Sequence, residues 1–114
     1  MKNDSFLVKS ILENIKNIED FMKNITYAKF LKDTQKQFAV YKALENIGEA
    51  VKNLSEEIKQ KYNSIKWREI AGMRDKLSHE YFGIKVERVW ETVGHDIPQF
   101  KKDLAEIKKA LSQF

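Results

Sequence analysis

Three side chains in the second half of the chain have the types and spacing needed for phosphate chemistry. Arg74, His79 and Tyr81 stand in the run Arg-Asp-Lys-Leu-Ser-His-Glu-Tyr. Arginine is a permanent cation that binds a phosphate through two parallel hydrogen bonds. Histidine changes charge near neutral pH and can therefore take up and release a proton. These are the two parts that cleavage of RNA without a metal requires, and the tyrosine hydroxyl offers a place for a modification that blocks it.

The spacing of these residues on a helix limits how they act together. Asp75 precedes His79 by four residues, so its carboxylate shares a helical face with the imidazole and is expected to orient it. Arg74 and His79 are five residues apart, which is about 140° around an ideal helix. One straight helix therefore does not direct both side chains at one phosphate. Either a bent final turn or a second copy of the chain would bring them together.

The number of histidines also favours a dimer. Cleavage of RNA by its own 2′-hydroxyl needs a base for that proton and an acid for the leaving 5′-oxygen, but the motif has one histidine. Two chains meeting at this helix would supply two, with the arginines stabilising charge on the phosphorus oxygens. The other histidine, His95, has no carboxylate or histidine at clear metal-ligand spacing and is interpreted as structural or exposed, so no metal site is predicted.

Composition favours a single intracellular domain. The 114 residues predict one domain over 1–114. There are no cysteines, which excludes disulfides and cysteine-based zinc or redox sites. No apolar run has the length of a signal peptide or of a membrane span, so we expect a cytoplasmic protein without membrane contact. The net charge of +4 and the pI near 9.2 permit RNA binding without proving it.

Apolar residues recur at helical spacing, and the chain has only four glycines and one proline. The stripe of a first helix, with Asp4 or Ser5 as its cap, consists of Leu7, Ile11, Ile15, Ile18, Met22 and Ile25. A short helix over 27–31 follows, with Thr26 as its cap. Asp33 or Thr34 then opens a long helix. Its stripe comprises Leu44, Ile47, Val51, Leu54 and Ile58.

Gly48 lies inside this long helix and would cost roughly 1 kcal/mol relative to alanine, so it is interpreted as a point of close helix-helix approach. A further helix is expected over 66–82, with Gly83 as its left-handed cap. The last apolar stripe continues over 86–114. Pro98 interrupts it, which predicts either a kink after Gly94 or a restart capped by Asp96. The fold class predicted is all-α: an antiparallel bundle of four to five helices.

Two further sets of residues have both a structural and an RNA-binding interpretation. Trp67 either packs in the core or flanks the site and stacks on a base. Four lysines of the last helix repeat after seven residues and share one side: Lys101, Lys102, Lys108 and Lys109. They form either a solvated face or a stripe that follows RNA phosphates.

The runs Trp-Arg-Glu-Ile-Ala-Gly-Met-Arg-Asp at 67–75 and His-Glu-Tyr-Phe-Gly-Ile at 79–84 together resemble the signature of HepT toxins, members of the HEPN superfamily of helical ribonucleases. Upstream, Ile-Gly-Glu-Ala at 47–50 and Leu-Ser at 54–55 resemble the family's third helix. Downstream, Val-Trp-Glu-Thr-Val at 89–93 and Asp-Ile-Pro at 96–98 resemble its last helix. The resemblance covers nearly the whole chain. In one departure, Lys85 stands where relatives often have an aspartate that would cap the last helix.

The resemblance implies a HEPN-like homodimer that cuts RNA in the cleft between protomers, with no required metal or cofactor. Arg74 and His79 would be the catalytic pair. Tyr81 would receive AMP from ATP through a partner antitoxin, a minimal nucleotidyltransferase of the MntA type. The alternative from a different class is a non-catalytic binding subunit that docks such a nucleotidyltransferase and is modified by it without cutting RNA.

Overall fold

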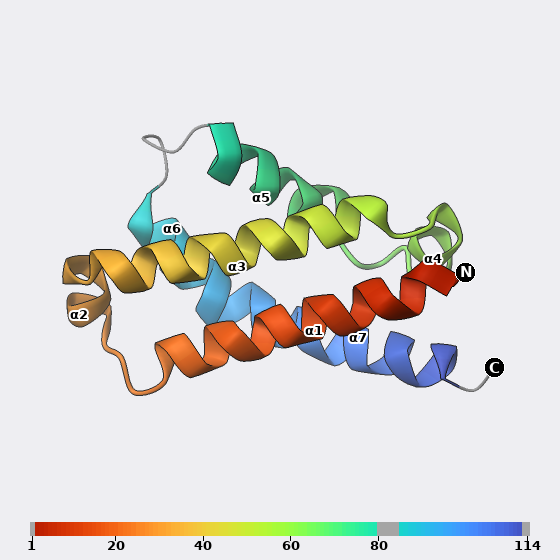
Figure 1. Cartoon of the computed structure of the whole chain (residues 1–114), viewed down its shortest axis with the longest axis horizontal. Helices are drawn as coiled ribbons and strands as arrows, with labels where there is room; N and C mark the ends of the chain where they lie inside the picture. The colour runs from red at the N-terminus through yellow and green to blue at the C-terminus, as the bar shows by residue number, and fades with distance from the viewer. Residues whose placement is uncertain (1, 80–84, 113–114) are drawn as a thin grey trace.

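Four long helices lie side by side in the order α5, α3, α1 and α7, each antiparallel to its neighbour (Figure 1). The computed structural model describes residues 2–79 and 85–112. The long helices are α1 (Lys2–Met22), α3 (Thr34–Asn53), α5 (Trp67–His79) and α7 (Ile97–Leu111), and the short segments are α2 (Tyr27–Lys32), α4 (Glu56–Lys61), α6 (Val86–Glu91) and a π-helical turn η2 (Thr92–Asp96). The described residues contain no strand, which confirms the predicted all-α bundle. None of the described helices has the length and apolar character needed to cross a membrane.

The predicted apolar stripes form the core. The α1 stripe centres on the fully buried Ile11, Ile15 and Ile18, while Leu7 and Met22 are only partly buried. From the other long helices the core receives Leu44, Ile47, Val51, Trp67, Leu77, Ile97, Phe100, Leu104 and Ile107. Burying such a side chain stabilises the fold by about 1.5–3 kcal/mol, so these stripes decide which face of each helix points inward.

Local capping positions α2 and α3 as the sequence predicts. The Thr26 hydroxyl accepts a hydrogen bond from the Lys29 amide at 3.2 Å, and the Asp33 carboxylate accepts one from the Lys36 amide at 2.9 Å. Each cap satisfies an amide that has no partner within its own helix. Of the two caps considered for α3, the structure uses Asp33.

The start of α1 and the end of α3 differ from the sequence prediction. The first helix begins at Lys2, so Asp4 lies inside its first turn and does not cap it. Its buried carboxylate instead accepts hydrogen bonds from the Ser55 amide at 2.9 Å and the Ser55 hydroxyl at 2.6 Å. Ser55 also caps α4 by accepting from the Ile58 amide at 3.3 Å. The predicted long helix therefore ends at Asn53, and Ile58 belongs to a separate helix.

Pro98 is accommodated by a π-helical turn. The segment η2 widens the helix over Thr92–Asp96, where a regular turn would bring the proline ring against the carbonyl of Gly94. The Asp96 side chain makes no capping hydrogen bond, so the predicted restart at this residue is wrong. In place of the predicted kink after Gly94, the helix continues through one wide π-helical turn that contains Gly94.

Trp67 fixes the beginning of α5 in the core. Its side chain is buried, its indole N–H donates to the Tyr62 carbonyl at 3.1 Å, and its ring meets Phe100 edge-on at 5.9 Å between centroids. The packing interpretation is confirmed, and stacking of Trp67 on a base is not supported because the ring faces protein. Helix α5 is thus anchored at the end opposite His79.

Candidate functional site

Helix α5 touches α3 at Gly48, and Arg74 stands at the point of contact. A Cβ placed on Gly48 would lie 2.6 Å from Arg74 Cβ, 3.1 Å from the Arg74 backbone nitrogen and 3.2 Å from the Ile70 carbonyl oxygen. Any side chain at position 48 would therefore push the two backbones apart. The predicted close approach at Gly48 is confirmed, and it sets the position of the Arg74 backbone.

Two carboxylates hold the Arg74 guanidinium. Arg74 Nε lies 2.8 Å from Glu49 Oε2 on α3, and Arg74 Nη1 lies 3.2 Å from Asp75 Oδ1 on its own helix. The arginine side chain is 31% exposed. Because a guanidinium has five N–H donors, these two contacts leave donors for a phosphate. The cation is therefore held in one place and still reaches solvent.

The backbone of α5 is described from Trp67 to His79, which fixes the relation between Arg74 and His79 along the helix. This segment is α-helical from Trp67 through His79, so residues five apart point about 140° from each other. The turn that follows His79 lies outside the described residues, so the bent final turn and the second copy of the chain both stay predictions. The side chain of His79 and the whole of Tyr81 lie outside the described residues, so their placement stays a prediction.

Asp75 has a contact that its spacing did not suggest. We expected it to orient His79 four residues later; the structure shows it paired with Arg74, its neighbour in sequence. The Asp75 side chain is exposed, and only Oδ1 makes this contact. The second oxygen remains available, so orientation of His79 by Asp75 stays a prediction.

Glu49 is the contact residue that sequence spacing did not identify. It lies 25 positions before Arg74 and on another helix. The one feature of the sequence that could have pointed to Glu49 as a partner of Arg74 is its position directly after Gly48 in the Ile-Gly-Glu-Ala run. The glycine lets α5 come close, and the next residue then reaches Arg74 from the flank of the contact.

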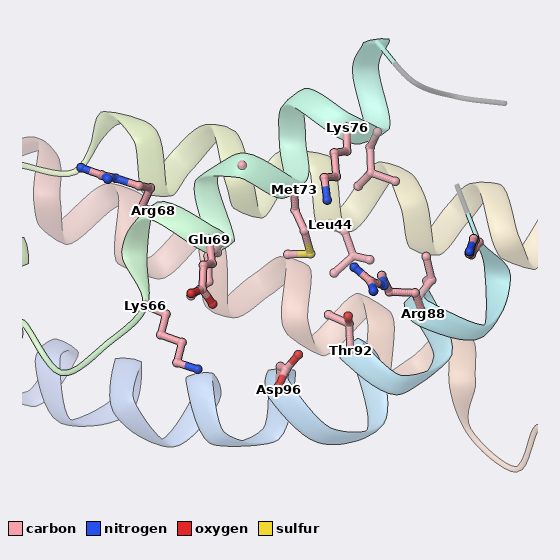
Figure 2. A pocket seen from close by; sticks show the side chains of 14 residues that line it. Leu44, Lys66, Arg68, Glu69, Met73, Lys76, Arg88, Thr92 and Asp96 are labelled. Atoms are coloured by element: carbon pink, nitrogen blue, oxygen red, sulfur yellow. The ribbon is translucent and has the colours of Figure 1, made fainter. Parts of the chain in front are cut away.

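A groove of about 850 Å³ runs along the other side of α5, between that helix and the segments α6 and η2. Figure 2 shows Met73 and Leu44 at its floor, with Lys76 from α5 and Arg88 from α6 extending into it. Arg74 does not line this groove. Among the described side chains, no three histidine, aspartate or glutamate residues gather as a metal site would require. Helix α5 thus separates the Arg74 contact from a basic groove.

Known proteins similar to this chain include archaeal and bacterial proteins named as RNases. A protein of Thermococcus cleftensis named as a probable ribonuclease HepT is 46% identical over 102 residues, covering 90% of this chain and 93% of the relative. A candidate RNase of Methanocaldococcus jannaschii is 48% identical over 99 residues, covering 87% of this chain and 82% of the relative. Another candidate RNase, from Caldanaerobacter subterraneus, is 42% identical over 107 residues, covering 94% of this chain and 96% of the relative.

No solved structure shows a significant match to this chain. The family model described as ribonuclease HepT-like matches residues 11–107, a span that contains the Arg74 contact, α5 and the groove. The predicted all-α bundle agrees with this match. The chain therefore belongs to the HepT-like ribonuclease family.

Proposed function

We propose that this protein is a cytoplasmic toxin endoribonuclease that cuts RNA without a metal, as a homodimer, through Arg74 and His79. The observation that carries the proposal is the Arg74 guanidinium, held by Glu49 and Asp75 on the helix that also contains His79, in a chain of the HepT-like ribonuclease family. A partly exposed arginine fixed by two carboxylates is prepared to bind a phosphate with little loss of side-chain freedom.

The proposed reaction needs no group beyond the protein and RNA. One histidine, as base, removes the proton of the 2′-hydroxyl, and that oxygen attacks the neighbouring phosphorus. The bond from phosphorus to the 5′-oxygen breaks, and a second histidine, as acid, gives that oxygen a proton. Arg74 stabilises the negative charge on the phosphorus oxygens during this exchange. The products are a 2′,3′-cyclic phosphate and a 5′-hydroxyl.

The homodimer in this proposal is supported by the geometry of α5. Arg74 faces α3, and the α-helical backbone turns His79 about 140° away from it. A second chain facing the end of α5 would place its own histidine opposite the first arginine. Such an arrangement would supply both an acid and a base, although each chain has one histidine in this motif.

The direct test is cleavage of an end-labelled RNA pool by the purified protein in EDTA. We expect cutting, with 2′,3′-cyclic phosphate at the new 3′ ends, and no gain on adding Mg²⁺. Cutting only with added metal, or products with 3′-hydroxyl ends, would contradict the proposed chemistry. A dimeric, unmodified protein that cuts no RNA in a broad pool would favour the binding-subunit alternative.

We further propose that AMP transfer to Tyr81 by an MntA-type nucleotidyltransferase silences the site. The tyrosine oxygen would attack the α-phosphorus of ATP, pyrophosphate would leave, and the phenolic proton would pass to a base of the partner enzyme. Each AMP adds a negative phosphodiester and a nucleoside close to the end of α5. Both would compete with RNA for Arg74 and obstruct access to His79.

Tyr81→Phe is expected to keep ribonuclease activity within about twofold and to escape silencing, because phenylalanine keeps the ring but has no oxygen to modify. Intact mass and RNA cleavage after incubation with the partner enzyme and ATP measure both effects. Tyr27→Phe is the matched control, since Tyr27 is an exposed tyrosine of α2 whose ring lies against Trp90. That variant should still be modified and silenced; a Tyr81→Phe protein that is silenced as well would contradict the assignment.

Glu49→Ala is expected to lower kcat by about ten- to a hundredfold, because Arg74 loses the partner that positions it. The free energy of unfolding should change by less than about 1 kcal/mol, since partly exposed ion pairs contribute little. Glu49→Gln keeps a polar oxygen at the position next to Arg74 Nε and should retain most of kcat.

Glu45→Ala is the control for Glu49→Ala. Glu45 lies one turn earlier on α3 and pairs with Lys42 at 3.3 Å, whereas Arg74 pairs with Glu49. Its loss should leave kcat unchanged. If Glu49→Ala also keeps its wild-type kcat, Glu49 does not position Arg74; if only KM rises, Glu49 affects substrate binding alone.

A further inference from the structure

We propose that the basic end of the groove beside α5 is a binding site for RNA phosphates, formed by Lys76, Lys85 and Arg88. The inference rests on the proposed ribonuclease function and assigns the path of the RNA strand on each protomer. The strand would pass along the groove wall formed by α6 and reach the end of α5, where His79 stands.

The groove concentrates positive charge. Its lining has five cationic side chains, Lys66, Arg68, Lys76, Lys85 and Arg88, against two acidic ones, Glu69 and Asp96. The whole chain has a net charge of only +4, so most of the excess lies here. Within residues 2–79 and 85–112, none of these five cations makes an ion pair. Cations without acidic partners in a concave surface attract a polyanion.

One end of the groove carries cations without acidic neighbours. Figure 2 shows Lys76 and Arg88 approaching from opposite walls at that end, whereas Glu69 and Asp96 lie toward the other end, together with Lys66 and Arg68. Lys85 directly precedes α6, one turn before Arg88, and is exposed. Since His79 follows Lys76 by three residues, it stands only about 4.5 Å farther along the helix axis. The three cations therefore lie beside the predicted point of cleavage.

The floor of the groove favours a single strand held by its backbone. It presents aliphatic and thioether groups, with Leu44, Met73 and Val89 among them, and none of the described residues that line it is aromatic. Such a floor accepts the apolar face of a base but offers few polar groups that would distinguish one base from another. We infer that this site holds phosphates and tolerates sequence, so that base preference must arise elsewhere.

The test measures RNA affinity in a cleavage-dead background. A fluorescein-labelled single-stranded RNA is titrated with His79→Ala protein, with and without Lys76→Gln and Arg88→Gln, between 50 and 200 mM salt. Both residues are exposed, so the fold should tolerate the changes. We expect at least a tenfold loss of affinity, and a slope of log K against log salt that is shallower by about 1.4, which is 0.7 for each lost phosphate contact.

The control removes the same charge elsewhere. Lys102→Gln with Lys109→Gln, on the exposed face of α7, should change affinity by less than threefold. An equal loss in both pairs would overturn the proposal, because net charge alone would then explain binding; a larger loss in the α7 pair would place the RNA along that helix. If the Lys76→Gln and Arg88→Gln protein keeps its RNA affinity but no longer forms a dimer, the groove binds a second copy of the chain. If it keeps its RNA affinity but is no longer modified by the nucleotidyltransferase, the groove binds that enzyme. Either result would overturn the phosphate site.

Failure of this inference and failure of the proposed function give different results. The outcome that refutes only the phosphate site has two parts. The wild type cuts RNA in EDTA, and Lys76→Gln with Arg88→Gln leaves RNA affinity unchanged in the His79→Ala background and cleavage unchanged when His79 is present. If the His79→Ala parent binds no RNA and the wild type cuts none, both proposals are refuted.

Discussion

His79→Ala is expected to slow RNA cleavage by about 10²–10⁴-fold, the loss that follows removal of a general acid or base. In a symmetric dimer the substitution removes both proton-transfer groups together, which places the expected effect at the upper end of this range. Single-turnover cleavage of end-labelled RNA in EDTA measures the rate without a contribution from product release.

The chain has its own control for this experiment in His95, its other histidine. His95 is exposed in the π-helical turn, and His95→Ala should cut RNA at the wild-type rate. Equal losses in the two variants would indicate a general effect of histidine removal, and an active His79→Ala protein would refute the proposed catalytic pair.

Mixed dimers test whether the site is shared between chains. Arg74→Ala should lose activity on its own because no cation remains to stabilise the phosphorus oxygens. If the arginine of one chain acts with the histidine of the other, a mixture of Arg74→Ala and His79→Ala chains contains some sites with one intact pair. Cutting above the level of either variant alone is expected, limited by the single His79 that a mixed dimer keeps. A mixture no more active than the two separate variants would contradict a shared site.

Gly48→Ala is expected to lower the free energy of unfolding by about 1–3 kcal/mol, although alanine is the better helix former by roughly 1 kcal/mol. The added Cβ would lie 2.6 Å from Arg74 Cβ and 3.1 Å from a backbone nitrogen. Neither atom is the end of a flexible side chain, so α3 and α5 must separate. Activity should fall as well, because Arg74 moves with its helix.

Gly72→Ala provides the matched control. Gly72 lies in α5, and a Cβ built there meets nothing within 4 Å. The same chemical change should therefore stabilise the protein, by up to about 1 kcal/mol. Thermal or urea unfolding measures the change in the free energy of unfolding, which should be negative for Gly48→Ala and positive for Gly72→Ala. A Gly48→Ala protein as stable as Gly72→Ala would show that the contact between α3 and α5 is not tight.

Features that depend on neighbouring residues were predictable from the sequence. The all-α class follows from apolar residues at three- and four-residue spacing, and the caps at Thr26 and Asp33 depend on amides three residues away. Family membership also follows from contiguous motifs in α3, α5 and the last helices. Gly48 could be interpreted as a close contact because a glycine inside a long helix has a cost that something must offset.

The tertiary structure alone decided which residues meet across the bundle. Asp4 accepts hydrogen bonds from Ser55, 51 residues away, just after α3 ends at Asn53. Glu49 meets Arg74 from another helix, and the basic groove combines Lys76 of α5 with Arg88 of α6. The physical reason is that periodicity specifies which face of a helix is buried, while packing decides which helix that face meets and which polar side chains come together beside it.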